Sequence, residues 1–514
     1  MNQKKLLTLG LGLLVAGSAA CNNDKLTEIN KNPNNPEDVP ASSLFTSAVR
    51  LGVSRWLGTT YDLRSTEFVA QHLAEVQYPD EDAYKRLGAA DTRATFDGAY
   101  TGELADLRKV IAKGKAANEP GTTGPALVMR TWEYSYLTDT WGDVPYFEAL
   151  AGDSVGATIT PKYDPQQAIY ADFFKTLGET STMLASAQNT LGGADPIYGG
   201  SPSKWAKFSN SLRARLALRV VNVDPALADA QLKAAFAAPG GLMTSNADNA
   251  TFKWPGDGVY DNPWAVNFQT RDDHRVSRTL LDPMLANNDP RVPVFAMPTV
   301  ADPSKYAGLQ NALTHAGASA FFNTTSRPGA VFYPGATAYG TFGGGGKAFP
   351  SFLLTYAEVS FIKAEAAARS LGGLTPAQAQ GFYRDGIRAS MEQWGVSSAA
   401  IDTYLASPAG TLQAGAAGLT QIAYERWVAL YSDGGNAWAL WRRTCVPASL
   451  KPGPNALQNT VIRRFQYSPT EVSVNKEQLD AAIARQGADA FTTRVWWDTK
   501  PTAAPTYFAG CGQS

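Results

Sequence analysis

The segment from residue 239 to residue 346 combines aromatic and hydrogen-bonding side chains with many glycines and prolines. The residues that carry this mixture are Trp254, Tyr260, Asp261, Asn262, Trp264, Phe268, Arg271 and Asp272. Flat aromatic faces can pack on the C–H surface of a sugar ring while fixed polar groups bind its hydroxyls. We therefore take the two tryptophans, Tyr260, Arg271 and Asp272 as candidate ligand-binding residues. The alternative is that most of these aromatic rings belong to the core.

A second candidate set precedes residue 90. Tyr78, Tyr84 and Arg86 follow the second expected helix, and binding residues are often carried by loops on a rigid scaffold. We include all three among the candidate ligand-binding residues, with the same alternative that a tyrosine here is a core residue.

Two glutamates offer an enzymatic interpretation. Glu358 and Glu365 are seven residues apart, about two helical turns, and paired carboxylates catalyse glycoside hydrolysis. Their helix is alanine-rich and apolar, however, which favours internal ion pairs. We predict that their partners come from the following arginines: Arg388, Arg426, Arg442 and Arg443.

Other catalytic and cofactor patterns are missing from the sequence. There is no Gly-x-Ser-x-Gly around a nucleophile and no Walker-type phosphate loop. The three histidines, His72, His274 and His315, are widely separated, and no Cys/His cluster has metal-ligand spacing. We expect no catalytic residue, no metal and no cofactor. The net charge of -1 also argues against a nucleic-acid partner.

The N-terminus resembles an export signal. Lys4 and Lys5 precede an apolar run over 6–16, which is too short to span a bilayer, and small residues then lead to Cys21. We expect residues 1–20 to be removed and Cys21 to be acylated, which would hold the protein at a membrane. The small residues before Cys21 also suit ordinary signal peptidase. Residues 21–40 are polar and rich in Asn and Pro, a composition typical of a tether.

The remaining cysteines, Cys445 and Cys511, either form a disulfide or stay as free core thiols, and their spacing does not decide between these states.

From residue 41 onward the hydrophobic period is mainly helical. We predict helices over 41–58, 60–77, 92–115, 126–140, 203–220, 353–371, 375–394, 420–432, 436–443 and 476–486, with a turn at 121–125 and a stop at Gly372-Gly373. Asp164-Pro165 and Asp224-Pro225 are expected to begin two more, with Asp164 as the N-cap of the first. Short turns favour antiparallel hairpins, so stacked helical hairpins are expected in a single domain over 41–514. The region over about 239–346 is expected to be irregular, with short strands, and to bind the ligand.

Six ordered blocks of sequence carry a resemblance to a known family. They are Leu137-Thr138-Asp139 with Gly142-Asp143-Val144-Pro145-Tyr146; Tyr198-Gly199-Gly200 with Lys204-Trp205 and Asn210-Ser211-Leu212-Arg213; Asn288-Asp289-Pro290-Arg291; Tyr356-Ala357-Glu358 with Phe361-Ile362-Lys363-Ala364-Glu365-Ala366; Glu425-Arg426-Trp427 with Trp441-Arg442-Arg443; and Arg463-Arg464-Phe465 with Tyr467. With the segment from Leu26 to Asn34, they make nearly the whole chain resemble the SusD/RagB family of nutrient-binding outer-membrane lipoproteins of Bacteroidetes.

The resemblance implies a mostly helical fold with four tetratricopeptide-like hairpins. It also implies a lipid-anchored position on the outside of the outer membrane, as a lid over a SusC-like TonB-dependent transporter. Members bind glycans, or in some cases peptides, without catalysis, through early helix ends and a loop-rich insertion. We therefore expect a protein that captures an oligosaccharide and delivers it to such a transporter. Peptide capture, a surface glycoside hydrolase and a purely adhesive scaffold are the alternatives.

Overall fold

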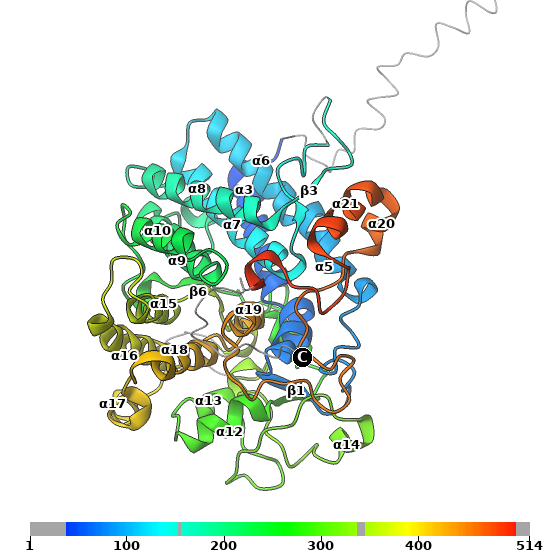
Figure 1. The fold of residues 1–514 in the computed structure, drawn as a ribbon, viewed down its shortest axis with the longest axis vertical. Coiled ribbons are helices and arrows are strands. Elements are labelled where there is room, and N and C mark those ends of the chain that lie inside the picture. Colours follow the sequence, from blue (N-terminus) through cyan, green and yellow to red (C-terminus); the bar gives the residue numbers. More distant parts are fainter. Residues whose placement is uncertain (1–37, 153–155, 337–344, 500–514) are drawn as a thin grey trace, which may run out of the picture.

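The computed structural model describes residues 38–152, 156–336 and 345–499. Helices dominate these residues, and the strands among them form three two-stranded antiparallel sheets (Figure 1). The mostly helical fold class is therefore confirmed. Among the described helices, none combines the length and the apolar character that a membrane crossing requires. The expected signal segment, Cys21, nearly all of the tether and Cys511 lie outside the described residues. Cys445 is disulfide-bonded.

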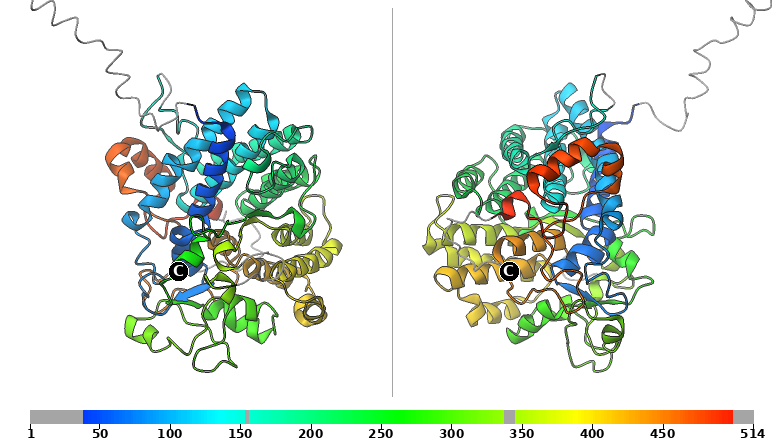
Figure 2. Two further views of the ribbon diagram at one scale, coloured as in Figure 1. Left: turned by 180° about the vertical axis from the view of Figure 1, so that it is seen from behind. Right: turned by 45° about the vertical axis from the view of Figure 1, so that its right-hand side comes forward.

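The first group of helices forms a stack in which neighbours in sequence are neighbours in space. Its members are α3 (Ala41–Trp56), α6 (Glu103–Ala116), α7 (Pro120–Trp141), α8 (Gln166–Leu184), α9 (Pro202–Arg219) and α10 (Pro225–Phe236). Helices α6 to α10 each pack on the next, and α3 lies along α6 and α7. Figure 2 shows α3, in dark blue, running along the outside of this stack. Short connections between antiparallel helices produce this arrangement.

A second group of helices continues the stack after residue 355. It consists of α15 (Tyr356–Ala368), α16 (Pro376–Gln393), α17 (Ser398–Ala406), α18 (Gly415–Ala429) and α19 (Gly434–Thr444). Helix α15 contacts α9 and so joins the two groups, while α19 returns to contact α7. The predicted stack of helical hairpins is therefore present in both groups.

Sequence signals at helix starts were right at α10 and α16 and wrong at α8. The carboxylate of Asp224 accepts from the backbone N–H of Leu227 at 2.9 Å, and Thr375 and Gln378 form a capping box. The N-cap position of α8 is instead occupied by Pro165, which makes no side-chain capping hydrogen bond. Asp164 lies in a short strand, and its carboxylate accepts from the N–H groups of Tyr146 and Phe147 at 3.0 and 2.8 Å.

Two other predicted boundaries need correction. The single helix expected over 92–115 is two helices, α5 (Ala89–Thr101) and α6, because the backbone of Gly102 is not helical (φ -110°, ψ -108°). The turn expected at 121–125 lies inside α7, which begins at Pro120. Proline at a first helical position loses no hydrogen bond, so Pro120 starts the helix rather than preventing it.

The structure differs most from the prediction over residues 60–77, where one helix was expected. The chain there forms a π-helix, η1 (Thr59–Thr66), followed by the single turn α4 (Glu67–Val69). Gln71 then adopts a left-handed conformation (φ 56°), which a helix cannot continue through. The chain next forms strand β1 (Leu73–Glu75), which pairs with a strand some 200 residues away.

The loop-rich region over 239–346 contains short elements, as expected. They are β4 (Ala250–Phe252), α11 (Pro263–Asn267), β5 (His274–Val276), α12 (Arg278–Ala286), α13 (Val292–Phe295) and α14 (His315–Ser319). Strand β4 pairs with β6 (Ser351–Leu354), and β5 pairs with β1. Helices α12 to α14 and strand β1 lie together at the lower end of the molecule (Figure 1).

The remaining described elements are small. They are β2 (Val144–Pro145), β3 (Tyr163–Asp164), α20 (Pro469–Val474), α21 (Lys476–Gln486), and the 3-10 turns Gly192–Ala194, Asn246–Asp248, Ala330–Phe332, Gly346–Ala348, Pro408–Gly410 and Trp496–Asp498. Strands β2 and β3 pair with each other. Helix α21, over Lys476–Gln486, matches the predicted range.

A continuous aromatic core joins the two groups of helices. Its fully buried tryptophans are Trp56, Trp132, Trp141, Trp205, Trp394, Trp427, Trp438 and Trp497. A separate apolar cluster lies between α15, α16, α17 and α18. The core therefore spans both helical groups and forms a rigid support for the loop-rich region.

Candidate ligand-binding site

The pairing of β1 with β5 assembles one group of candidate residues. Leu73 lies opposite Val276, and Glu75 lies opposite His274. Tyr78 leaves the ribbon three residues after Glu75, and Arg271 and Asp272 enter it just before His274. Residues from both candidate sets therefore meet at this end of the ribbon.

Tyr78 and Arg271 are in direct contact at this end. The guanidinium carbon of Arg271 lies 4.8 Å from the centre of the Tyr78 ring, in a cation–π contact. Tyr78 is nevertheless 56% exposed. The backbone N–H groups of Gln77 and Tyr78 donate to Glu75 Oε1 at 3.1 and 3.3 Å, which fixes the turn that presents the ring.

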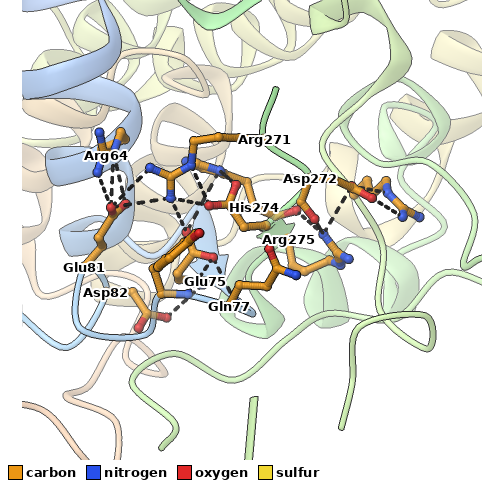
Figure 3. Close-up of polar contacts among 12 residues, drawn as sticks. Arg64, Glu75, Gln77, Glu81, Asp82, Arg271, Asp272, His274 and Arg275 are labelled. Carbon is orange, nitrogen blue, oxygen red and sulfur yellow. Dashed lines mark hydrogen bonds and ion pairs between the residues drawn. The ribbon is translucent and has the colours of Figure 1, made fainter. Parts of the chain in front are cut away.

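Arg271 is itself held by three carboxylates (Figure 3). Its Nε donates to Asp273 Oδ2 at 2.6 Å, and its terminal nitrogens lie 3.4 Å from Glu81 and 3.7 Å from Glu75. Glu81 is shared with Arg64. Several charge-assisted contacts in one network hold a side chain better than an isolated surface pair does.

The pKa values of two acids in this network are shifted in opposite directions. Burial raises the pKa of Glu75. Burial also acts to raise the pKa of Asp273, but hydrogen bonds from His274 and Arg271 outweigh it and hold that pKa below its usual range. Asp273 is therefore a stable anionic anchor for Arg271.

Asp272 organises the other side of the site. Its carboxylate is paired with Arg327 and lies 3.7 Å from Arg275. Both guanidinium groups lie over the ring of Phe322, at 4.7 Å for Arg275 and 5.7 Å for Arg327. The preceding residue, Phe321, is 41% exposed. The site thus has one aromatic ring, Tyr78, against Arg271 and a second, Phe322, against the arginines that lie beside Asp272.

One group of side chains in this network has the composition of a metal site. Ligand atoms of Glu75, Glu81 and His274 lie within 4.8 Å of one another. The guanidinium of Arg271 already contacts both glutamates, and His274 Nδ1 lies 3.0 Å from Asp273 Oδ1. The positive charge that balances these acids is therefore supplied by arginine, and a cation could enter only by displacing it.

Three candidate aromatic residues lie in the core. The exposed fractions of Tyr84, Trp254 and Trp264 are 1%, 5% and 3%. Trp254 Nε1 donates to Ser351 Oγ at 2.9 Å, and the ring of Trp264 packs on Phe332 at 4.9 Å. Their faces are used for packing, so we correct their assignment to core residues.

The last two candidates are exposed but do not belong to the β1–β5 cluster of contacts. Tyr260 is 45% exposed, and its ring lies 5.0 Å from the guanidinium carbon of Arg50 on α3. Arg86 is an exposed residue between β1 and α5. Of the eight predicted ligand residues, the structure brings together Tyr78, Arg271 and Asp272.

The two glutamates considered for hydrolysis are internal ion-pair partners. Glu358 accepts from Arg215 Nε at 3.0 Å and from Arg426 at 2.7 Å, and Glu365 accepts from Arg443 at 2.5 Å. Burial acts to raise both pKa values, but these arginines lower each to about 2. A general acid must hold its proton near the working pH, which these groups do not.

The arginine partners were predicted in part. Pairing with Arg426 and Arg443 is confirmed, and Arg215 was missed because it comes from α9, far away in sequence. Arg388 instead pairs with Asp402, and Arg442 donates to the carbonyl groups of Asp139 and Arg463.

Comparison with known proteins identifies the family. A family model described as starch-binding and associating with the outer membrane, SusD-like, matches residues 33–468. The chain belongs to the SusD-like family. Among curated protein sequences, none matches it.

Solved structures resemble this SusD-like protein over nearly its full length. A chitin-binding protein shares 27% of its residues, with a TM-score of 0.75, over 90% of this chain and 100% of that chain. A SusD homologue from Bacteroides uniformis is 25% identical, with a TM-score of 0.73 and the same coverage. A chitin-binding SusD homologue from Flavobacterium johnsoniae, at 24% identity, 90% and 99% coverage and a TM-score of 0.76, supports the fold.

Sequence reasoning missed part of the SusD-like protein's site. Phe321, Phe322 and Arg327 lie about 50 residues after Arg271 and Asp272, and their contacts depend on how the loops fold back. The Phe-Phe pair within the loop-rich region was the available signal. The acids that hold Arg271 were also missed: Glu75 and Glu81 reach it only through the β1–β5 pairing, and Asp273 is its near neighbour in sequence.

Proposed function

We propose that this protein captures an oligosaccharide at the surface formed by Tyr78, Arg271 and Asp272. The observation that carries the proposal is the exposed Tyr78 ring, fixed beside a rigid polar network. The family description and the chitin-binding relative support a glycan as the ligand. We further propose that the protein passes its ligand to a SusC-like TonB-dependent transporter.

The charges at the site favour a neutral glycan. Arg271 is paired with acids, and Asp272 is paired with Arg327 and Arg275, so an ionic ligand would have to compete with internal partners. Sugar hydroxyls can use the remaining donor and acceptor capacity without breaking these pairs. Affinity then comes from ring contact and hydrogen bonds, and it should depend weakly on salt.

The test compares two exposed tyrosines that share the same local chemistry. Tyr78 and Tyr260 each lie beside an arginine, at 4.8 and 5.0 Å. Calorimetric titration with chitohexaose, maltohexaose and xylohexaose should give at least one measurable affinity. Loss of a stacked ring costs about 0.5–1.5 kcal/mol, so Tyr78→Ala should weaken that affinity by roughly two- to tenfold.

Tyr260→Ala is the matched control and should leave the affinity unchanged. If Tyr260→Ala weakened binding and Tyr78→Ala did not, the ligand would lie on the segment between β4 and α11, which would contradict our site. Binding of peptides alone would contradict the glycan proposal. Release of new reducing ends during incubation would favour the hydrolase alternative.

The transporter role has its own test. Affinity purification of the tagged protein from detergent-solubilised outer membranes should also recover a large barrel protein, in an amount comparable to that of the tagged protein. Recovery of the tagged protein alone would contradict the delivery role and leave the binding role intact.

A further inference from the structure

A polar cavity of about 340 Å³ lies at the other end of the β1–β5 ribbon. Gln71 precedes β1 and Arg278 follows β5, so both lie beyond the Leu73–Val276 pair, away from Tyr78. The first turns of α12 form one wall of the cavity, and the loop around Lys451 forms another. Its volume is within the range of small-ligand pockets.

The floor of the cavity is built from buried amides that are fixed by hydrogen bonds. Gln71 Nε2 donates to the carbonyl of Lys451 at 2.5 Å, and its Oε1 accepts from Thr279 Oγ1 at 2.7 Å. Asn311 Nδ2 donates to the carbonyl of Leu73 at 2.7 Å. These contacts join four separate segments of the chain, so the floor is rigid before any ligand binds.

The rim of the cavity carries exposed charges that are only weakly satisfied. Arg278 and Asp282 are 3.7 Å apart, with 55% and 56% of their side chains exposed. An exposed pair at this distance contributes little. Lys451 is a second exposed cation on the rim. The described lining has no aromatic ring, which distinguishes this cavity from the Tyr78 surface.

We propose that this cavity binds a sugar unit that carries an anionic group, such as a uronic acid. Arg278 and Lys451 would bind the anionic group, and the hydroxyl and amide groups of the wall would bind the ring hydroxyls. Asp282 opposes the ligand charge and competes for Arg278. The choice of a sugar rests on the proposed function, whereas the cavity itself shares no residue with the Tyr78 surface.

Substitutions at Arg278 and Asp282 should change the affinity for an acidic sugar in opposite directions. Titration with digalacturonate at low salt, with galactobiose as the neutral match, should show binding of the acidic sugar. Arg278→Gln should weaken it about threefold, and Asp282→Asn should strengthen it about threefold, as expected for exposed charges. Lys451→Gln should act like Arg278→Gln, and higher salt should weaken binding to the wild type.

Matched controls come from a distant exposed pair. Arg388 and Asp402 lie 2.7 Å apart on α16 and α17, so Arg388→Gln and Asp402→Asn make the same charge changes away from the cavity. Both controls should leave digalacturonate binding unchanged. Equal binding by the wild type and all three cavity variants would overturn the proposal. Competition by sulfate as effective as by digalacturonate would overturn the sugar specificity.

A third comparison separates this site from the proposed function. Tyr78→Ala should keep digalacturonate binding while it loses affinity for the neutral oligosaccharide. Loss of acidic-sugar binding in Tyr78→Ala, with the cavity variants unaffected, would place the acidic sugar at the Tyr78 surface and overturn the cavity site.

Discussion

Buried arginines are the residue-scale feature that most constrains this protein. Arg443 and Glu365 have 2% of their side chains exposed and bind each other at 2.5 Å. Arg369 also contacts Glu365, at 2.9 Å, so Arg443 supplies one of two guanidinium partners of this buried carboxylate. Removing one member of such a pair costs far more than removing a surface pair, because the other charge stays buried.

Arg443→Met should therefore destabilise the protein, by up to about 3–5 kcal/mol, because Glu365 keeps only Arg369 as a partner. The comparison is Arg388→Met, whose partner Asp402 is exposed, and which should cost no more than about 1 kcal/mol. Urea unfolding followed by tryptophan fluorescence measures both. Similar midpoints for the two variants would contradict the importance of the buried pair.

The buried glutamates Glu358 and Glu365 should also make the folded state less stable at low pH. Their folded-state pKa values are about 2, below the ordinary value of 4.5. A lowered folded pKa contributes stability that is present above the unfolded pKa and is lost as the pH falls through the folded value. These two residues should therefore weaken the fold between about pH 4.5 and pH 2.

Glu133 on α7 predicts the opposite pH dependence. Neither of its carboxylate oxygens has a hydrogen-bond partner among the described residues, and burial, with the nearby charge of Glu103, raises its pKa. A raised folded pKa contributes stability below the unfolded pKa, which is lost as the pH rises through the folded value. Glu133→Gln should raise stability by about 1 kcal/mol or more at pH 8 and by less at pH 5.

Thermal melts at the two pH values measure this difference. The corresponding change at Glu179, an exposed acid on α8, provides the baseline. An equal gain at both pH values would show that charge burial is not the cause.

At the scale of elements, the helical hairpins depend on close approach between helices. A Cβ atom added to Gly386 on α16 would lie 2.7 Å from the ring of Phe361 on α15. Gly381 on the same helix has open space at the corresponding position. One helix thus contains a glycine required by packing and another that is not.

Gly386→Ala should destabilise the protein by about 1–3 kcal/mol, because the added methyl group overpacks the contact. Gly381→Ala should stabilise it by about 0.5–1 kcal/mol, because alanine restricts the unfolded chain and favours helix. Differential scanning calorimetry of both variants gives the sign directly. Two shifts in the same direction would contradict the packing between α15 and α16.

The elements also show where sequence reasoning succeeded. Helices with an apolar stripe and a clear cap, such as α10 and α16, were predicted because their signals are local. The strand after Gln71 was missed because its pairing with the distant β5 decides it, and the break at Gly102 was missed because a single glycine in a helical pattern need not end the helix. The same division holds at the site: Tyr78 and Arg271 could be chosen by residue type, but burial of Trp254 and Trp264 depends on rings contributed by distant segments.

At the scale of the whole molecule, the proposed anchor makes a prediction about cell fractionation. If Cys21 is acylated, Cys21→Ala should move the protein from the outer-membrane fraction to a soluble one, because the acyl chains supply the membrane affinity. Mass spectrometry of the mature N-terminus should find a lipid on Cys21 in the wild type. An unmodified Cys21 in membrane-bound protein would contradict the anchor.

The β1–β5 ribbon has a consequence for biogenesis. Its strands are about 200 residues apart in sequence, so closing this contact is entropically costly and slow compared with forming local hairpins. A nascent chain that has emerged only as far as residue 270 contains Tyr78 without Arg271 and Asp272, and Gln71 without the other residues that line the cavity. Ligand recognition should therefore be the last property that the maturing polypeptide acquires, and a chain in transit through the cell envelope should not retain sugar before it reaches its destination.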